Sequence, residues 1–244
     1  MRIITLAFLL SVTFVGCSKC QSYLGRLKPA IPDTLTFTGK TVVFIGNSIT
    51  LGNVGVSPQS NRWPTVFSTA KGATESNIAI SGQVLQNASP CGLPIFNKTT
   101  IPVFTNQAAL FFSLGINDIG INTPSMTVAG YEATLDSVMD YAINTKGWPS
   151  KRIILLTPYW ITGYSNYDAY TGCGHTTANV ARHEAYVSAV INVAAARRNN
   201  IANMYQAMKD SPSNGTFLSG DGLHPNNTGA AFIANYLAGL NFLL

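Results

Sequence analysis

The chain has 244 residues, of which 46% are hydrophobic and only 10% are charged, with a formal net charge of +5 and a pI near 9.1. This length suffices for one α/β domain with a full core, and the composition excludes a disordered protein, which would be richer in charge. Paired basic residues occur only at Lys151-Arg152 and Arg197-Arg198, so no basic stripe supports binding to nucleic acid.

Residues 1–16 have the features of an export signal. Met1-Arg2 is a short positive start, the apolar run from Ile3 to Val15 follows, and this run is too short for a typical transmembrane helix. Gly16-Cys17 then resembles a bacterial lipoprotein cleavage site, in which Cys17 is the lipidated residue. We therefore expect an exported lipoprotein, anchored to a membrane through Cys17 alone and facing the periplasm or the cell surface. Phe14 replaces the usual leucine, so plain secretion is the alternative.

The other cysteines carry no metal or redox motif. Cys17 and Cys20 are spaced as Cys-x-x-Cys, but no second pair and no βα context accompany them. Cys91 and Cys173 fall in predicted loops, and an exported protein permits a disulfide between them. The sequence leaves that pairing open.

A tether and a single domain follow the export signal. Residues 17–36 contain Pro29, Pro32 and several polar residues, which is typical of a linker. Residues 37–244 show no internal repeat and no second composition, and therefore form one predicted domain.

Strands and helices alternate along this domain. Continuous apolar runs predict strands buried on both faces, helical spacing predicts amphipathic helices, and Pro and Gly mark helix ends. The expected elements are strands at 41–45, 77–80, 108–114, 153–156 and 201–205, and helices at 63–71, 128–144, 177–199 and from Pro225 to about 239. This order predicts an α/β fold with a mainly parallel, roughly five-stranded sheet covered on both faces, in which Trp63 anchors its helix to the sheet.

Ser48 is a candidate nucleophile just beyond the first strand. Gly46 permits a sharp turn there, which would expose the serine hydroxyl at the edge of the sheet and let a helix begin. Taken alone, Asn47-Ser48 is equally compatible with ordinary turn or helix-cap chemistry. The Gly-x-Ser-x-Gly word of an α/β-hydrolase elbow is absent around Ser48.

Asp221 and His224 form a candidate base and its orienting carboxylate. A carboxylate three residues upstream on a tight turn reaches the histidine Nδ1, which leaves Nε2 free to take a serine proton. The alternative is a surface Asp-Gly turn beside an idle histidine.

Asn117 and Gly82 complete the set. The Asn117 side-chain amide could donate to an oxyanion, and Gly82 offers a backbone N–H without an obstructing side chain. Each is also compatible with a plain turn. Ser48, Gly82 and Asn117 all follow predicted strand ends, however, and the carboxyl ends of parallel strands are where such folds bind ligands.

The four short motifs around these residues resemble those of the SGNH/GDSL esterases. The family's Ser, Gly, Asn and His match Ser48 in Gly-Asn-Ser-Ile, Gly82 in Ser-Gly, Asn117 in Gly-Ile-Asn-Asp, and His224 in Asp-Gly-Leu-His-Pro. The resemblance covers about residues 40–240 and implies a three-layer, flavodoxin-like αβα sandwich.

The resemblance also implies roles for these residues. Ser48 would be the nucleophile, His224 the base and Asp221 its orienting group, while Ser48 N–H, Gly82 N–H and the Asn117 amide would form the oxyanion hole. Asn47 stands where the family often has Asp, which puts in doubt only a carboxylate role at that position. The mechanism needs no cofactor or metal, and no metal-binding motif is present.

The substrate side of the prediction rests on aromatic residues. A loop beyond the fourth strand is rich in rings that suit sugar faces or simply pack the loop onto the domain: Tyr159, Trp160, Tyr164, Tyr167 and Tyr170. Tyr159, Trp160 and His175 are the candidate substrate contacts, whereas His183 is expected on a solvated helix face.

We expect hydrolysis of short-chain or acetyl esters, perhaps on carbohydrates. Lysophospholipase or thioesterase activity is the alternative within the family. A non-catalytic glycan-binding lipoprotein on an esterase scaffold is the alternative outside it.

Overall fold

The structure of the protein is a computed structural model that describes residues 33–86, 92–120, 127–164 and 180–244. The chain divides into two units, Met1–Asp33 and Thr34–Leu244, and the following account concerns the second. All four cysteines lie outside the described residues, as do the export signal and most of the predicted tether.

A five-stranded parallel sheet forms the centre of the second unit. Its strand order is β2-β1-β3-β4-β5, as in a doubly wound fold. Every residue of β3 and β4 is buried, as are all but the first residue of β1, because their apolar runs face helices on both sides. The strands are β1 (Thr41–Gly46), β2 (Thr74–Asn77), β3 (Ala109–Ser113), β4 (Ile153–Leu156) and β5 (Asn200–Ala202).

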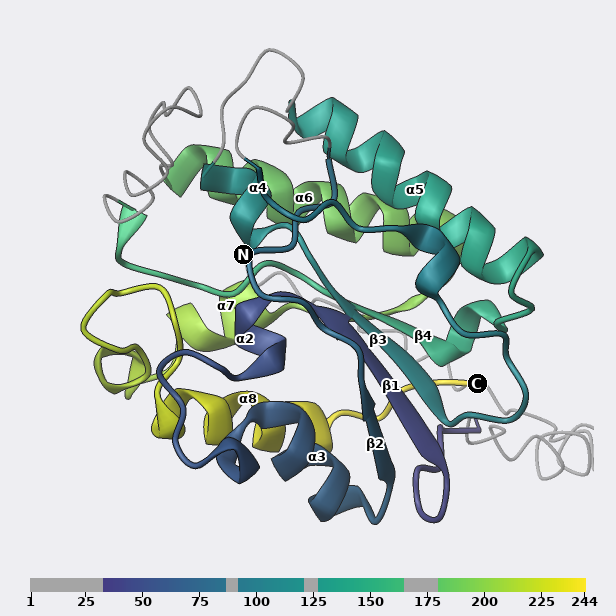
Figure 1. Cartoon of the computed structure of the whole chain (residues 1–244), viewed down its shortest axis with the longest axis horizontal. Coiled ribbons are helices and arrows are strands. Elements are labelled where there is room, and N and C mark those ends of the chain that lie inside the picture. Colours follow the sequence, from purple (N-terminus) through teal and green to yellow (C-terminus); the bar gives the residue numbers. More distant parts are fainter. Residues whose placement is uncertain (1–32, 87–91, 121–126, 165–179) are drawn as a thin grey trace, which may run out of the picture. The chain divides into compact units, whose positions relative to one another are not determined.

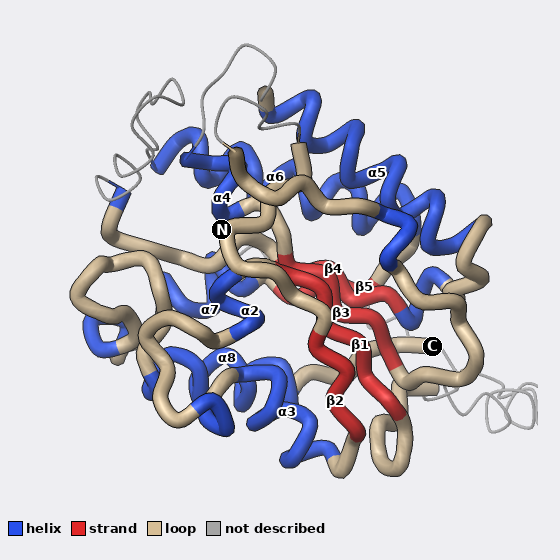
Figure 2. The backbone as a smooth tube through the Cα atoms, in the orientation of Figure 1, coloured by secondary structure: helices blue, strands red, loops and turns tan. Residues whose placement is uncertain are grey.

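Helices cover both faces of the sheet. Helices α3 (Trp63–Lys71) and α8 (Asn227–Gly239) pack together on one face, and α5 (Val128–Asn144) and α6 (Val180–Arg197) pack together on the other (Figure 1). Figure 2 shows the strands enclosed between these two helical layers. The predicted three-layer αβα sandwich is confirmed. The shorter helices are α2 (Ser48–Leu51), α4 (Ile116–Gly120) and α7 (Met204–Lys209).

An aromatic cluster joins α3 to the sheet. Phe44 of β1 stacks on Phe111 of β3 with ring centroids 5.3 Å apart, and Trp63 meets Phe44 edge-on at 5.2 Å. Trp63 is only 1% exposed. The expectation that it anchors its helix to the sheet is confirmed. The carboxyl end of β1 leads into the site described below.

Three details differ from the sequence prediction. Strand β2 covers 74–77 instead of 77–80, because the apolar segment after Asn77 keeps only single bonds to β1, from Ile78 N–H to Phe44 O and from Ile80 N–H to Gly46 O. Strand β5 ends at Ala202 and is followed by α7, which the sequence reading missed. The folded unit begins slightly before position 37, since Leu35 is buried and its N–H donates to Phe242 O.

No helix in the described ranges combines the length and the apolar character needed to cross a bilayer.

Candidate active site

The candidate site lies at the carboxyl ends of β1 and β3, which are neighbours in the sheet. The chain runs from β1 to the edge strand β2 on one side and later returns to β3 on the other side. This reversal is the topological switch point at which doubly wound folds bind ligands. Ser48 opens α2 just after β1, and Asn117 lies in α4 just after β3.

Gly46 and Asn47 shape the turn that presents Ser48. A Cβ atom at position 46 would collide with the Thr50 side chain, so only glycine lets α2 fold back over the strand end. Asn47 caps α2, since its Oδ1 accepts the Ile49 N–H at 3.1 Å. The neutral amide therefore performs a capping role that needs no charge.

Ser48, His224 and Asp221 form a continuous hydrogen-bonded chain. Ser48 Oγ lies 2.9 Å from His224 Nε2, although the two residues are 176 positions apart in the sequence. His224 Nδ1 lies 2.6 Å from Asp221 Oδ2 on the other side of the ring. The structure thus brings together the three residues that the sequence reading selected as nucleophile, base and orienting group.

Asp221 is held in place by its own turn. Its Oδ1 accepts the backbone N–H groups of Leu223 at 2.9 Å and His224 at 3.0 Å. Partial burial alone would raise the pKa of Asp221, but the hydrogen bond from the His224 ring and the two backbone N–H groups outweigh it and lower the pKa. The carboxylate therefore stays ionised beside the imidazole.

The segment Thr162-Gly163, which follows β4, is hydrogen-bonded to the turn that carries Asp221 and His224. The Gly222 carbonyl accepts the N–H groups of Thr162 and Gly163, both at 2.9 Å. Gly222 has a φ of +65°, and a Cβ there would lie 2.7 Å from Gly163 N. The sequence reading missed this support, because Thr162-Gly163 forms no recognisable motif and the contact depends on close approach of two backbones.

Three hydrogen-bond donors of the predicted oxyanion hole come from three segments. The Asn117 side-chain amide donates to Gln83 O at 3.0 Å, which ties α4 to the loop that follows Gly82. Gly82 has a φ of +73° and no side chain above its N–H. Within the described part of the chain, no acceptor takes the backbone N–H of Ser48 or of Gly82. Both are available to a ligand.

The predicted substrate contacts have different fates. Tyr159 is 1% exposed and its hydroxyl bonds to Ser113 Oγ at 3.0 Å, so this tyrosine is a core residue and the prediction for it was wrong. The sequence pattern did not reveal that the chain stays buried at Thr157 and Tyr159 after β4 ends. Trp160 is half-buried and lines a hollow of about 210 Å³. His175, Tyr167 and Tyr170 lie outside the described residues.

His183 also differs from the expectation. It is fully buried on the inner face of α6, where its Nδ1 lies 2.9 Å from the Tyr164 hydroxyl and its ring meets Tyr205 edge-on. Burial lowers the pKa of His183 to about 4. The polar neighbours Arg182 and Glu184 suggested a solvated face, but His183 occupies the apolar stripe of the helix.

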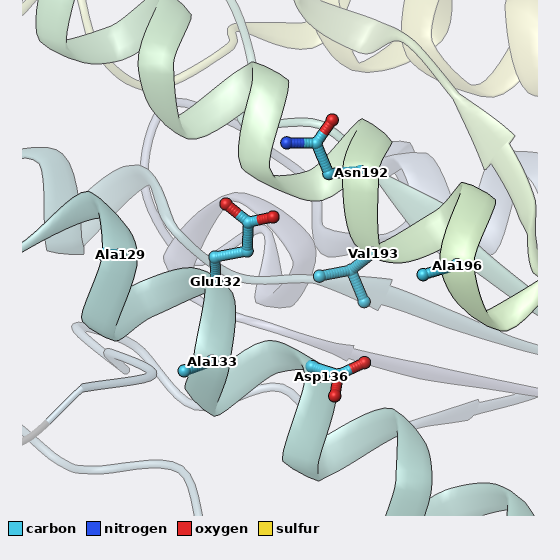
Figure 3. A pocket seen from close by; sticks show the side chains of 7 residues that line it. All are labelled: Ala129, Glu132, Ala133, Asp136, Asn192, Val193 and Ala196. Atoms are coloured by element: carbon cyan, nitrogen blue, oxygen red, sulfur yellow. The ribbon is translucent and has the colours of Figure 1, made fainter.

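A hollow of about 450 Å³ lies on the helical layer, between α5 and α6 (Figure 3). None of the residues discussed above contributes to it. Its walls are Ala129, Glu132, Ala133, Asp136, Asn192, Val193 and Ala196. Asp136 is already bound by Arg197, with Nε–Oδ1 and Nη2–Oδ2 distances of 2.6 and 2.7 Å.

Comparison with known proteins gives a consistent result. Residues 44–232 match the model of the GDSL-like lipase/acylhydrolase family. No curated protein matches the chain significantly.

Solved structures share the fold. A lipase/acylhydrolase from Enterococcus faecalis is 22% identical with a TM-score of 0.56, over 82% of this chain and 93% of that one. A member of the G-D-S-L lipolytic family from Veillonella parvula is 18% identical with a TM-score of 0.57, over 80% and 94%. A carbohydrate acetylesterase from Sinorhizobium meliloti is 13% identical with a TM-score of 0.62, over 82% and 96%.

Proposed function

Because the chain belongs to the GDSL-like lipase/acylhydrolase family, we propose that it is a serine esterase that uses Ser48, His224 and Asp221. One observation carries the proposal. Ser48 Oγ, the His224 ring and the Asp221 carboxylate are joined by contacts of 2.9 and 2.6 Å. A binding protein has no need of a base beside a serine, whereas acyl transfer needs both.

The proposed mechanism follows each proton through His224. His224 Nε2 takes the proton of Ser48 Oγ as Oγ bonds to the ester carbonyl carbon, and the C=O electron pair moves onto oxygen. The ionised Asp221 holds the imidazole in the correct tautomer and stabilises its positive charge. His224 then returns the proton to the leaving alcohol, and the C–O bond of the ester breaks. Water then gives a proton to the same histidine as its oxygen bonds to the acyl carbon, and His224 returns that proton to Ser48 Oγ as the bond to the acid breaks.

The oxyanion would be stabilised by three donors: the N–H groups of Ser48 and Gly82 and the amide of Asn117. Preorganised donors of this kind act on charge that develops only in the transition state, and each contributes roughly 3–4 kcal/mol to catalysis.

We propose acetylated or short-acyl carbohydrates as the substrate class. The hollow at Trp160 supports this, because it places an aromatic ring beside the Asp221 turn and such rings bind sugar faces. Its other walls are Thr162, Asn214, Gly215, Leu218, Ser219, Gly220 and Gly222. The structurally similar carbohydrate acetylesterase is in line with the proposal. Comparing acetylated oligosaccharides with lysophospholipids and acyl thioesters tests it, and preference for either of the latter would contradict it.

We also propose that the protein is exported and anchored through a lipid on Cys17. The signal-like start and the Gly16-Cys17 junction support this. Metabolic labelling with a radioactive fatty acid should mark the wild type and not Cys17→Ser. Release of unlabelled wild-type protein into the medium would indicate plain secretion instead.

The decisive experiment for the esterase activity is Ser48→Ala. Hydrolysis of a chromogenic acetate should fall by at least about 10⁴-fold, as when other serine nucleophiles are removed. A fluorophosphonate probe should label the wild type and not the variant. Ser188→Ala is the matched control, since Ser188 is exposed on α6 and its hydroxyl donates to Glu184 O within the same helix. Full activity in Ser48→Ala would refute the assignment, and a folded wild type that takes no label would favour glycan binding without catalysis.

A further inference from the structure

Asp118 is a fully buried carboxylate next to the proposed oxyanion-hole asparagine. Its Oδ1 accepts the N–H groups of Leu85 at 3.0 Å and Gln86 at 2.9 Å, and its Oδ2 shares the Leu85 N–H at 3.1 Å. The side-chain amide of the adjacent Asn117 donates to Gln83 O in the same loop. Two consecutive residues therefore hold one loop by its carbonyl and by its N–H groups.

This loop carries Gly82, which is held between two anchors. On one side, Ile80 N–H donates to Gly46 O at the end of β1, two residues before Ser48. On the other side, Leu85 and Gln86 bind Asp118 in α4. Since β2 has already ended at Asn77, the regular sheet does not set the position of Gly82. These two anchors, together with the bonds of Val84 to Pro94 O and Phe96 N–H, set its position relative to both Ser48 and Asn117.

Anchoring a loop with a buried carboxylate costs desolvation free energy. Burial raises the pKa of Asp118 to about 6, in spite of the backbone N–H groups of Gln86 and Leu85 and the positive charge of Arg182, all of which lower it. Burial raises the pKa of the Tyr131 and Tyr186 phenols, and the electrostatic interaction of both phenols with the Asp118 carboxylate also raises it. A neutral residue would fill this position at a smaller desolvation cost.

We propose that Asp118 is a positioning residue of the oxyanion hole, which holds the Gly82 N–H and the Asn117 amide at the spacing that the transition state requires. It acts through the loop and touches no substrate. The inference rests on the proposed esterase function. The expected loss in rate follows from the sensitivity of catalysis to displacements of about 1 Å.

A double-mutant cycle with Asn117 tests this role, using the full chain and a chromogenic acetate at pH 8. Asp118→Ala should lower kcat by about 10–100-fold and leave KM within about threefold, because the lost interactions act in the transition state. Asp118→Asn should lose less, since its remaining oxygen can still accept both N–H groups. In an Asn117→Ala background, Asp118→Ala should cost less than about threefold, because the hole it supports is already damaged.

A control variant and the following outcomes separate the possible interpretations. Asp140→Asn removes a carboxylate of α5 that binds Arg197 of α6, and should leave kcat unchanged. Equal losses from Asp118→Ala in both backgrounds, or kcat within threefold of wild type in both Asp118 variants, would overturn the positioning role. If Asp118→Ala does not fold, Asp118→Ser takes its place, because its shorter side chain cannot accept both N–H groups, and a folded Asp118→Ser variant with kcat within threefold of wild type overturns the role as well. Activity retained by Ser48→Ala in the same assay would instead refute the esterase mechanism.

Discussion

Two aspartates flank the site, and their surroundings contrast. The Asp221 side chain is about a third exposed and lies on a turn that binds it through neighbours two and three residues away. Asp118 is fully buried and binds a loop more than thirty residues away in the sequence. Local hydrogen bonds outweigh partial burial at Asp221 and lower its pKa, whereas complete burial dominates at Asp118 and raises its pKa to about 6.

The difference separates two uses of a carboxylate. In the proposed mechanism the negative charge of Asp221 itself is needed, because it must remain beside the imidazole when the imidazole becomes positive. At Asp118 the oxygen atoms are needed as acceptors, and the charge is a cost to the folded state. Removal of the charge should therefore affect chiefly catalysis at the first position and chiefly stability at the second.

The largest expected effect follows from loss of the charge at Asp221. Asp221→Asn keeps the shape of the side chain but favours the wrong histidine tautomer, so kcat on a short acyl ester should fall by about 10³–10⁴-fold. Steady-state kinetics at pH 8 measure this, with Asp140→Asn as the matched control. A loss smaller than tenfold would mean that Asp221 does not orient His224.

A glycine pair compares the supports of the two regions. Gly222→Ala would press a methyl group against the Gly163 backbone at a positive φ, and should lower the free energy of unfolding by about 3 kcal/mol. Gly82→Ala has the same strained φ but only ordinary contacts with Leu93 and Pro94, so about 1 kcal/mol is expected. Urea unfolding of both variants measures the difference. Equal losses would show that close approach to Thr162-Gly163 does not support the Asp221 turn.

A second effect on stability is a pH dependence that belongs to Asp118. Its pKa is about 6 in the folded state against 3.8 for an ordinary aspartate carboxyl, so the folded state binds more protons between these values. This contribution to stability is lost as the pH rises through that window. Relative to wild type, Asp118→Asn should therefore gain about 2 kcal/mol in unfolding free energy between pH 4.5 and pH 7. Denaturant titrations at the two pH values measure it, and an unchanged difference between the proteins would contradict the raised pKa.

Asp221 contributes to stability with the opposite sign. Its lowered folded pKa gives stability that is present above the unfolded pKa and is lost as the pH falls through the folded value. Its partial exposure makes that contribution small.

Much of the fold was predictable because it depends on local patterns. The continuous apolar runs of β1, β3 and β4 and the helical spacing of α3 and α5 specified these elements, and the strand-end positions of Ser48 and Asn117 predicted a shared edge. The Asp221–His224 pairing was predictable because three residues of one turn suffice to make it.

The rest depends on contacts between distant segments. Asp118 follows Asn117 directly, yet its partners Leu85 and Gln86 are apolar or neutral residues in a loop without a motif. His183 and Tyr159 were misplaced because polar neighbours and a loop-like Thr157-Pro158 concealed positions that face the core. In each case tertiary packing determines the environment of a polar group, and composition does not reveal it.

The 176-residue separation between Ser48 and His224 has a practical consequence. His224 lies three residues before α8, which packs on α3, so the proposed mechanism requires that this late helix is docked. Under that mechanism, ester hydrolysis would report complete folding of the chain, because a molecule with α8 undocked would hold a serine no more reactive than one in bulk solution.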